Sequence, residues 1–378
     1  MILTLDTENS TWSTGSPFDA RNFNVCISYK NEEEEGVVFG DLDKITKLLE
    51  KATTLIFFNG KYDVLWLRKL GLNCGGKRIW CAQVFEFLHS RQEHRYPSLE
   101  DTAARYGFGR KLDVVKSEYW SKGINTHEIP THILAEYALQ DVRLTWDIYH
   151  KQKEIQRPHQ RMLFSLQMQD LEVLAEMEWN GLYYNLEKSK EKAKEIEAEV
   201  SKIQEQLALH HNVPCFNWTS PEHLSALLYG GEITEKVRIP VGVYKTGKKA
   251  GETRFRIEER TYQLPRKYKP VKGSELAKEG KWSVAEEYLR QIKGDGELIE
   301  GILKIKELEK LNSTYFAKLP NLHAEEHWEP NIIHGQFNQV VAGTGRLSSS
   351  KPNLQNLAEP AQELFESRWD NMKLSTCS

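Results

Sequence analysis

Four carboxylates in the first 150 residues are spaced so that they could bind metal ions together. Asp6 and Glu8 lie two apart in an apolar run, Asp63 follows in a second motif, and Asp141 comes four residues after Tyr137. Carboxylates that converge on one site repel one another unless cations lie between them, and oxygen ligands suit hard divalent ions such as Mg²⁺, with Mn²⁺ as the alternative. Two such ions activate water and stabilise the leaving oxygen of a phosphodiester. The pattern predicts a nuclease with two divalent metal ions.

Local patterns place the first two carboxylates on a strand. Residues 1–8 are apolar-rich and strand-like, and side chains two apart on a strand share a face. Asp6 and Glu8 would therefore both reach one metal site. The apolar run over residues 54–58 predicts a second, buried strand beside it.

The other two carboxylates fall on predicted helices. Asn59-Gly60 indicates a turn into a helix, with Asp63 in its first turn. A helix from about residue 131 to 151 would carry Tyr137 and Asp141 on one face, because residues four apart are neighbours there. The phenol would then lie beside a metal-bound water.

Each of these motifs alone has a plainer interpretation. An Asp-x-Glu pair can be a solvated strand end, Asn-Gly can be a turn with a helix cap, and Tyr-x-x-x-Asp recurs by chance. All three occur here in one order, and each lies in the structural context that it needs. That combination favours the metal site.

Composition describes a chain without a global signal for its partner. The 378 residues predict two or three domains, and a net charge of −3 requires any nucleic-acid-binding surface to be local. The five cysteines form no C-x-x-C pair, so we expect reduced thiols in a cytoplasmic protein. No signal peptide or membrane span is expected.

The middle of the chain reads as helical. A helix is predicted over residues 158–179 and stops at Asn180-Gly181. Charged and amphipathic patterns over 185–211 and 298–319 predict an antiparallel helical arm. The helix predicted over residues 158–179 is expected to carry an apolar stripe of Leu163, Leu166, Met168, Leu171, Leu174 and Met177.

A basic segment lies between the two helices of the arm. Residues 236–281 hold 14 Lys and Arg against 5 Glu, and turn-rich residues 246–251 predict a hairpin. Basic and aromatic side chains in alternation suit a phosphate backbone. The candidate DNA-binding residues are Lys248, Lys249, Arg254 and Arg256. A solvated insertion without a ligand is the alternative.

The acidic motifs resemble those of the DEDD-type 3′→5′ exonucleases, in the tyrosine-bearing subclass. Residues 98–107 and 111–116 are similar to the helix and loop between the second and third motifs of that family. The resemblance implies that Asp6 bridges both metals while Glu8 and Asp141 hold the catalytic one. It also gives roles to three further residues: Asp63 at the second metal, Tyr137 orienting the attacking water, and Asn59 facing the substrate strand.

Residues 334–338 and the run 343–356 resemble the motif that opens the palm of family A DNA polymerases. Residues 216–224, 304–315 and 319–320 look like thumb elements of the phage-type branch. The resemblance implies the following roles: Arg346, Asn353 and Gln355 hold the primer–template duplex, and His334 and Thr344 support the loop.

Residues 363–374 look like the approach to the first catalytic strand of that family. The expected Asp-Tyr-Ser-x-Leu-Glu is replaced by Ser375-Thr-Cys-Ser378. We therefore expect both polymerase carboxylates to be missing here. Polymerase activity would then require a separately encoded palm and fingers chain, as in a gene split by an intron, an intein or a frameshift.

The predicted fold class is α/β: a ribonuclease H-like exonuclease domain with a mixed central sheet flanked by helices (1–152), a largely helical thumb with a hairpin-like insertion near 232–282 (153–330), and an incomplete palm (331–378). The predicted function is the N-terminal part of a family A DNA polymerase, with a proofreading exonuclease acting on single-stranded 3′ ends and with primer–template DNA as a further partner. The alternatives are a stand-alone 3′→5′ exonuclease acting on RNA or DNA, and a non-catalytic DNA-binding remnant.

Overall fold

The computed structural model describes residues 1–109, 114–213, 216–243, 251–294, 296–369 and 372. These residues form two compact units: unit 1 is Met1–Leu186 with Leu319–Ser378, and unit 2 is Glu187–Lys318. Among the helices described, none combines the length and the apolar content that crossing a lipid bilayer requires.

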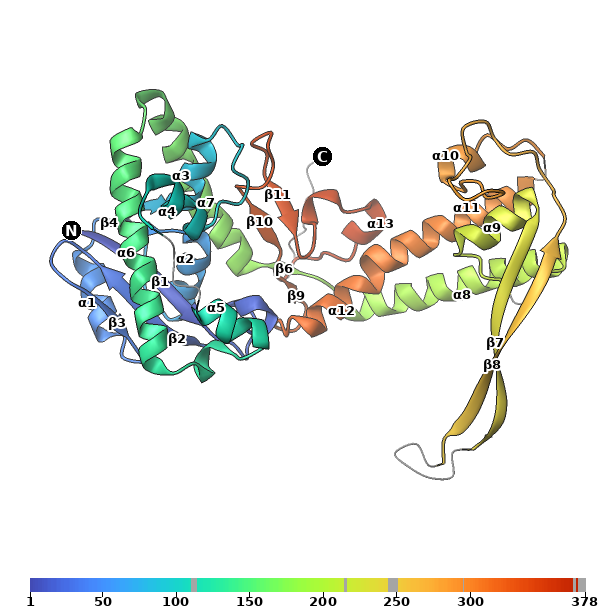
Figure 1. Ribbon diagram of the computed structural model, residues 1–378, viewed down its shortest axis with the longest axis horizontal. Coiled ribbons are helices and arrows are strands. Elements are labelled where there is room, and N and C mark those ends of the chain that lie inside the picture. The colour runs from blue at the N-terminus through green and yellow to red at the C-terminus, as the bar shows by residue number, and fades with distance from the viewer. Residues whose placement is uncertain (110–113, 214–215, 244–250, 295, 370–371, 373–378) are drawn as a thin grey trace. The chain divides into compact units, whose positions relative to one another are not determined.

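Unit 1 is built on a five-stranded mixed sheet with the strand order β3-β2-β1-β4-β5 (Figure 1). Strands β1, β2 and β3 pair antiparallel, whereas β4 pairs parallel with both β1 and β5. This mixed sheet with helices around it confirms the predicted fold class. The strands are β1 (Ile2–Asn9), β2 (Asn24–Lys30), β3 (Glu35–Val38), β4 (Thr54–Phe57) and β5 (Arg78–Cys81).

Helices surround this sheet, and α6 (Thr131–Ile155) lies across β1, β2, β3 and β4 (Figure 1). The two central strands bury Leu3, Leu5, Leu55 and Ile56 completely. Each such side chain contributes about 1.5–3 kcal/mol to folding, so β1 is held firmly where it carries Asp6 and Glu8. The other helices of this part are α1 (Asp43–Lys51), α2 (Gly60–Lys69), α3 (Ala82–His89), α4 (Leu99–Tyr106), α5 (Val114–Glu118) and α7 (Pro158–Asn180).

Helix α7 packs on α2 and α3 inside unit 1. Its buried apolar side chains include Phe164, Met168 and Leu171, which join the core beneath the sheet. The predicted stripe is wrong in part, because three of its members, Leu163, Leu166 and Met177, are largely exposed. Because α7 packs on helices of unit 1, the domain boundary predicted at residue 152 falls inside that unit. The division into three domains stays a prediction.

The remainder of unit 1 contains two pairs of short strands, of which only the first joins distant parts of the sequence. Strand β6 (Leu182–Tyr183) pairs antiparallel with β9 (Ile332–Ile333), and β10 (Gln336–Asn338) pairs antiparallel with β11 (Ser348–Ser350). The helices here are α12 (Lys318–Glu325) and α13 (Glu359–Gln362).

Unit 2 is mainly helical and carries one long hairpin. Helices α8 (Leu186–His211) and α11 (Gly296–Leu311) pack closely, since a Cβ added at Gly301 would lie 2.9 Å from Leu207. Strands β7 (Gly231–Val243) and β8 (Thr253–Leu264) pair antiparallel. Two shorter helices, α9 (Pro221–Tyr229) and α10 (Glu286–Leu289), complete the unit.

The helix predicted over 298–319 is wrong at its C-terminal end. Helix α11 stops at Leu311, and a single wider turn follows over Asn312–Phe316. Pro320 has no N–H with which to bond the Phe316 carbonyl, so an unbroken helix would leave that carbonyl without its partner. The Ser189 hydroxyl donates to it instead, at 2.9 Å.

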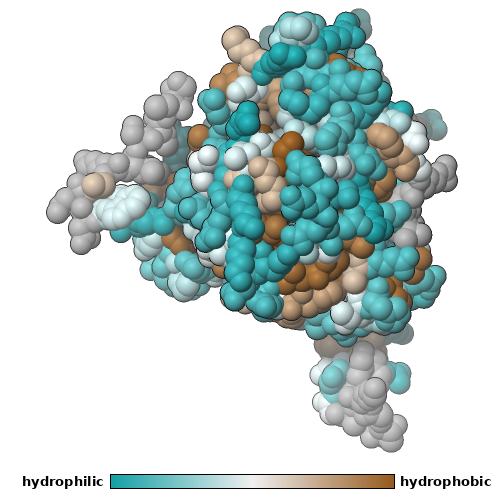
Figure 2. Space-filling model, turned by 90° about the vertical axis from the view of Figure 1, so that its left-hand side faces the viewer, coloured by the Kyte–Doolittle hydropathy of each residue, from teal (hydrophilic) through white to brown (hydrophobic). Residues whose placement is uncertain are grey.

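The face shown in Figure 2 is mostly hydrophilic, with smaller apolar patches between the polar side chains. Scattered apolar patches of this kind are normal on a folded protein.

Candidate metal centre

Three of the predicted carboxylates meet where β1 passes beneath α6. Asp6 and Glu8 alternate with buried residues on β1, and Asp141 projects from α6. One carboxylate oxygen from each of Asp6, Glu8 and Asp141 lies within 4.8 Å of the others. Glu8 and Asp141 are buried. Negative charge gathered in this way and removed from water requires cations or protons to offset it.

The fourth carboxylate, Asp63, lies beside this triad in the first turn of α2, as predicted. Its Oδ1 atom accepts hydrogen bonds from the backbone N–H of Thr7 (3.1 Å) and from the Thr7 hydroxyl (2.9 Å). Strand β4 pairs with β1 only over Ile2–Thr4, so the Thr7 N–H lies beyond the end of that pairing. Asp63 thus accepts a hydrogen bond from a strand N–H that lies beyond the β1–β4 pairing.

Burial and the charges of Asp6 and Glu8 raise the pKa values of neighbouring groups. Burial, followed by the charge of Asp6, raises the pKa of Asp63 well above its usual range, although the Thr7 hydrogen bonds oppose the shift. Burial and the charges of Glu8 and Asp6 likewise raise the pKa of Cys26, which pairs with Glu8 across β1 and β2. A divalent cation would lower the cost of holding these groups ionised.

The donor set fits a hard divalent cation. Asp6, Glu8 and Asp141 offer only carboxylate oxygen, which is the ligand type that Mg²⁺ and Mn²⁺ prefer. Of the four carboxylates predicted from the sequence, the structure brings these three together and holds Asp63 next to them through Thr7.

Tyr137 lies one helical turn before Asp141 on α6. Its ring is buried in an apolar cluster with Cys26, Val115 and Leu134, and it meets the edge of Trp120 at 5.6 Å between ring centroids. Packing on several sides fixes the ring beside the triad.

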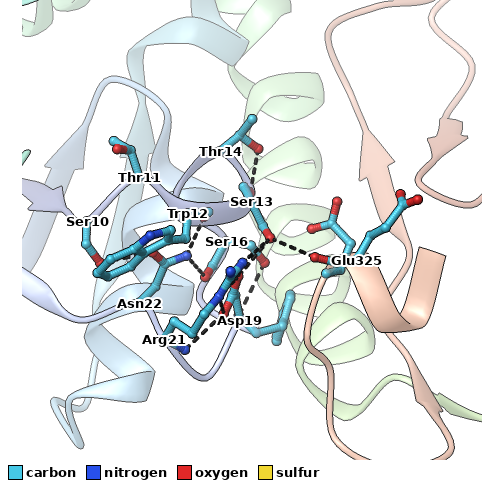
Figure 3. A network of polar contacts seen from close by, with 12 residues as sticks. Ser10, Thr11, Trp12, Ser13, Thr14, Ser16, Asp19, Arg21, Asn22 and Glu325 are labelled. Atoms are coloured by element: carbon cyan, nitrogen blue, oxygen red, sulfur yellow. Dashed lines mark hydrogen bonds and ion pairs between the residues drawn. The ribbon is translucent and has the colours of Figure 1, made fainter. Parts of the chain in front are cut away.

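The loop that follows β1 is held by its own polar side chains (Figure 3). The Ser13 hydroxyl donates to Asp19 at 2.7 Å, and the guanidinium of Arg21 contacts the same carboxylate. The Asn22 amide donates to the Trp12 and Ser16 carbonyls, at 2.6 and 2.9 Å. These contacts make the loop a fixed continuation of the strand that bears Asp6 and Glu8.

The same loop is attached to α2. The Gly15 carbonyl accepts hydrogen bonds from the Tyr62 hydroxyl (3.0 Å) and from the Trp66 indole N–H (3.1 Å). Burial and the charges of Asp63 and Glu8 raise the pKa of Tyr62, so its hydroxyl stays a donor.

A cavity of about 560 Å³ lies within unit 1, between α2 and β10. Asn59, the predicted substrate-facing residue, lines it together with Tyr62 and Gln83. Gln336 and Asn338 of β10 line it from the other side.

The residues predicted to hold a duplex lie on the surface of unit 1, with one exception. Thr344, Arg346, Asn353 and Gln355 are exposed, and the Asn353 side chain accepts a hydrogen bond from the Gln355 N–H at 3.1 Å. His334 is buried, its Nδ1 lies 2.8 Å from the Glu178 carbonyl, and its ring stacks on Phe18. His334 is therefore placed to support the neighbouring strands, and its predicted role at the DNA stays a prediction.

The predicted basic residues of the hairpin are described only in part. Arg254 and Arg256 lie on β8 of unit 2 and are exposed, with Arg256 3.6 Å from the Glu258 carboxylate. Lys248 and Lys249 lie outside the described residues.

Sequence reasoning missed a buried ion pair between Lys61 and Glu178, which also contacts Phe337. Lys61 lies inside the Asn59-to-Asp63 motif, so the sequence could have indicated that it belongs to the site. No sequence pattern could have indicated Glu178, because its partners are far away in the sequence.

Comparisons with known protein families match two segments of the chain. Residues 3–156 match the family described as 3′-5′ exonuclease, and residues 250–369 match DNA polymerase family A. The first segment contains the whole acidic site, and the second contains β8 and the run 343–356. The chain therefore carries a 3′-5′ exonuclease domain and part of the polymerase region of DNA polymerase family A.

The chain is similar to bacterial proteins named DNA polymerase I. The chain is 28% identical over 336 residues to the protein of Synechocystis sp., covering 88% of this chain and 30% of that one. It is 25% identical over 342 residues to the protein of Geobacillus stearothermophilus, covering 90% and 29%. The chain thus spans about 30% of the length of these relatives. Both are bacterial, so they do not support the predicted phage-type branch.

A solved structure shows the same fold. The chain is similar to the POL domain of Pol1 from M. smegmatis, in complex with DNA primer-template and dNTP, with a TM-score of 0.63 and 16% identity. The match covers 96% of this chain and 53% of that one.

Proposed function

We propose that this chain removes nucleotides from the 3′ end of single-stranded DNA by metal-dependent hydrolysis of the terminal phosphodiester. Asp6, Glu8 and Asp141 would hold one divalent cation, Mg²⁺ or Mn²⁺, and Asp6 and Asp63 would help to hold a second. When bound, such ions supply Lewis-acid stabilisation of the phosphate and lower the pKa of water.

The other residues of the site orient the reactants. Tyr137, fixed by packing beside Asp141, positions the attacking water. Asn59 faces the substrate strand from the start of α2. Holding reacting groups in place in this way accounts for a large part of the rate of many enzymes.

The observation that carries this proposal is the convergence of Asp6, Glu8 and Asp141 to within 4.8 Å. These carboxylates come from a strand and from a helix 135 residues further on (6 to 141). Such a cluster has no structural purpose that apolar residues would not serve better.

The test is a pair of matched variants on one helix. Asp141→Asn removes a metal ligand, whereas Asp147→Asn makes the same change at an exposed position of α6. With Mg²⁺ or Mn²⁺, a 5′-labelled single-stranded oligonucleotide should be shortened from its 3′ end by the wild type and by Asp147→Asn. Asp141→Asn should leave it as intact as a chelator does. Equal activity of the wild type and Asp141→Asn would overturn the proposal.

We also propose that the exposed loop with Arg346, Asn353 and Gln355 binds primer–template duplex. The similar POL domain of Pol1 from M. smegmatis was solved in complex with DNA primer-template, which supports this assignment. DNA synthesis would then occur when this segment acts with the rest of a polymerase region, in the same chain or as a separate one. The bacterial or host cytoplasm is the compartment in which we place this activity.

RNA is the competing substrate class for the same metal site. Residues 343–356 favour DNA, because the family A match covers them. Rates on DNA and RNA oligonucleotides of one sequence decide the question, and faster loss of RNA would favour a stand-alone RNA exonuclease.

A further inference from the structure

Glu178, in the last turn of α7, joins two segments of unit 1 that are far apart in the sequence. Its carboxylate forms an ion pair with Lys61 of α2 and accepts a 2.6 Å hydrogen bond from the backbone N–H of Phe337 in β10. Lys61 also donates to the Phe337 carbonyl. The Glu178 side chain is only 2% exposed and that of Lys61 18%. One buried carboxylate thus fixes β10 against α2.

The backbone of Glu178 adds a further contact to the same strand region. Its carbonyl lies 2.8 Å from Nδ1 of the buried His334, two residues before β10 begins. Buried ion pairs contribute little net stability compared with apolar packing, but they are satisfied in only one arrangement of the elements that they join. The pair therefore specifies a separation between α2 and β10.

That separation sets the width of the cavity of about 560 Å³. Asn59 and Tyr62 of the α2 segment line one side of it, and Gln336 and Asn338 of β10 line the other. Helix α2 also carries Asp63 beside the acidic triad. Amide and phenol groups of this kind bind sugars, phosphates and base edges of single-stranded nucleic acid, and aromatic rings stack on bases.

We propose that this cavity holds the unpaired DNA strand upstream of the scissile phosphate, with β10 as its second wall, and that Glu178 is the positioning residue that keeps this wall in place. The inference rests on the proposed exonuclease function. It adds to that function a positioning residue, Glu178, for the strand site.

The experiment compares two substrates on full-length variants. Ten-nucleotide oligothymidylate is long enough to occupy the cavity, whereas the p-nitrophenyl ester of thymidine 5′-monophosphate contains a single nucleoside and does not extend to β10. Glu178→Gln should raise KM for the oligonucleotide about tenfold, with kcat/KM for the ester within about twofold of wild type, because displaced binding groups lose affinity without changing the metal site.

Glu176→Gln is the matched control. It makes the same change on the same helix, at an exposed ion pair with Arg68, and both substrates should be cleaved as by the wild type. Glu178→Gln with an unchanged KM for the oligonucleotide would overturn the inference. So would equal losses on both substrates, since these would show damage to the fold or to the metal site.

Gln336→Ala keeps the inference testable if Glu178→Gln does not fold, because Gln336 is exposed. It should raise KM for the oligonucleotide about threefold and leave the ester unaffected, since one polar contact is lost. An unchanged KM would count against β10 as a wall. A wild type that cleaves neither substrate removes the exonuclease proposal itself, which separates that failure from the failure of this inference.

Discussion

The Asp63 carboxylate accepts two hydrogen bonds from Thr7, one from its backbone N–H at 3.1 Å and one from its hydroxyl at 2.9 Å. Thr7 lies on β1 between Asp6 and Glu8. One short stretch of strand therefore carries two members of the acidic triad and also orients the carboxylate beside them. Groups that orient a metal ligand in this way affect metal affinity nearly as strongly as the ligands do.

Replacing Thr7 by valine should weaken metal-dependent activity while keeping the fold. The substitution preserves the shape of the side chain and removes the hydroxyl that bonds Asp63. We expect a loss of about 10–100-fold in activity at limiting Mg²⁺, partly recovered at high Mg²⁺. Titration of the rate with Mg²⁺ measures this directly.

Thr4→Val is the control on the same strand. The Thr4 hydroxyl is buried and has no hydrogen-bond partner among the described residues. Its removal should leave the Mg²⁺ dependence unchanged and keep or slightly raise the free energy of unfolding, because burying a polar group without a partner is costly. Equal effects of the two variants on the Mg²⁺ dependence would contradict the role given to Thr7.

Tyr137→Phe should reduce activity less than Asp141→Asn. The ring packs against Trp120 and in an apolar cluster, so phenylalanine keeps the packing and removes only the hydroxyl that is proposed to orient water. We expect a fall of about 10–100-fold in kcat with unchanged metal affinity. Single-turnover rates at saturating metal test this, and a loss as complete as that of Asp141→Asn would give Tyr137 a different role.

The sequence predicted the acidic cluster of Asp6, Glu8 and Asp141 because most of its geometry is local. Strand alternation places Asp6 and Glu8 on one face, and helix spacing places Tyr137 and Asp141 together. Local spacing alone does not predict that the strand and the helix meet. That prediction came from the order of the motifs, which resembles the order in the exonuclease family.

The features that the sequence predicted wrongly or not at all depend on tertiary packing. The stripe of α7 was expected at Leu163 and Leu166, yet Phe164 is buried, because the position of the sheet decides which face of the helix turns inward. The Lys61–Glu178 pair joins residues 117 apart, and no local pattern marks such a partner. The wider turn that follows α11 accepts a hydrogen bond, at the Phe316 carbonyl, from the Ser189 hydroxyl of another helix.

Asp19 should make the stability of the protein depend on pH in the acid range. Burial alone would raise its pKa, but hydrogen bonds from Arg21 and Ser13 outweigh burial and lower the pKa to about 2, from 3.8. A lowered pKa in the folded state stabilises the protein above the unfolded value, so this contribution is complete above pH 4. It is lost as the pH falls from about 4 to about 2.

Asp19→Asn should therefore reduce the free energy of unfolding by roughly 1–2 kcal/mol at pH 7 and by much less near pH 2. Urea unfolding of wild type and variant at both pH values gives the difference. Asp41→Asn, at an exposed position, should show no such change, and a difference for Asp19→Asn that does not depend on pH would contradict the assignment.

Gly181 ends α7 in a conformation that a side chain cannot share. Its φ is 57° and its ψ is −174°, and an added Cβ would lie 2.6 Å from Ile332 and 3.0 Å from the Ile333 carbonyl. Gly181→Ala should lower the free energy of unfolding by roughly 2–5 kcal/mol, from backbone strain and overpacking together. Thermal unfolding of Gly71→Ala is the comparison, since Gly71 also has a positive φ but nothing within 4 Å and should lose only about 1–2 kcal/mol. Equal losses would show that packing against Ile332 does not matter.

Arg254 and Arg256 test whether the hairpin of unit 2 contacts the phosphate backbone. Both are exposed on β8, and each phosphate contact contributes about 0.9 to the slope of log K against log salt concentration. The double change Arg254→Ala/Arg256→Ala should weaken binding to a primer–template duplex and reduce that slope by up to about 1.8. Lys190→Ala/Lys192→Ala removes the same charge from α8, where both lysines are exposed, and should leave the slope unchanged. If both double variants reduce the slope equally, the arginines act only through net charge and the hairpin is not a DNA contact.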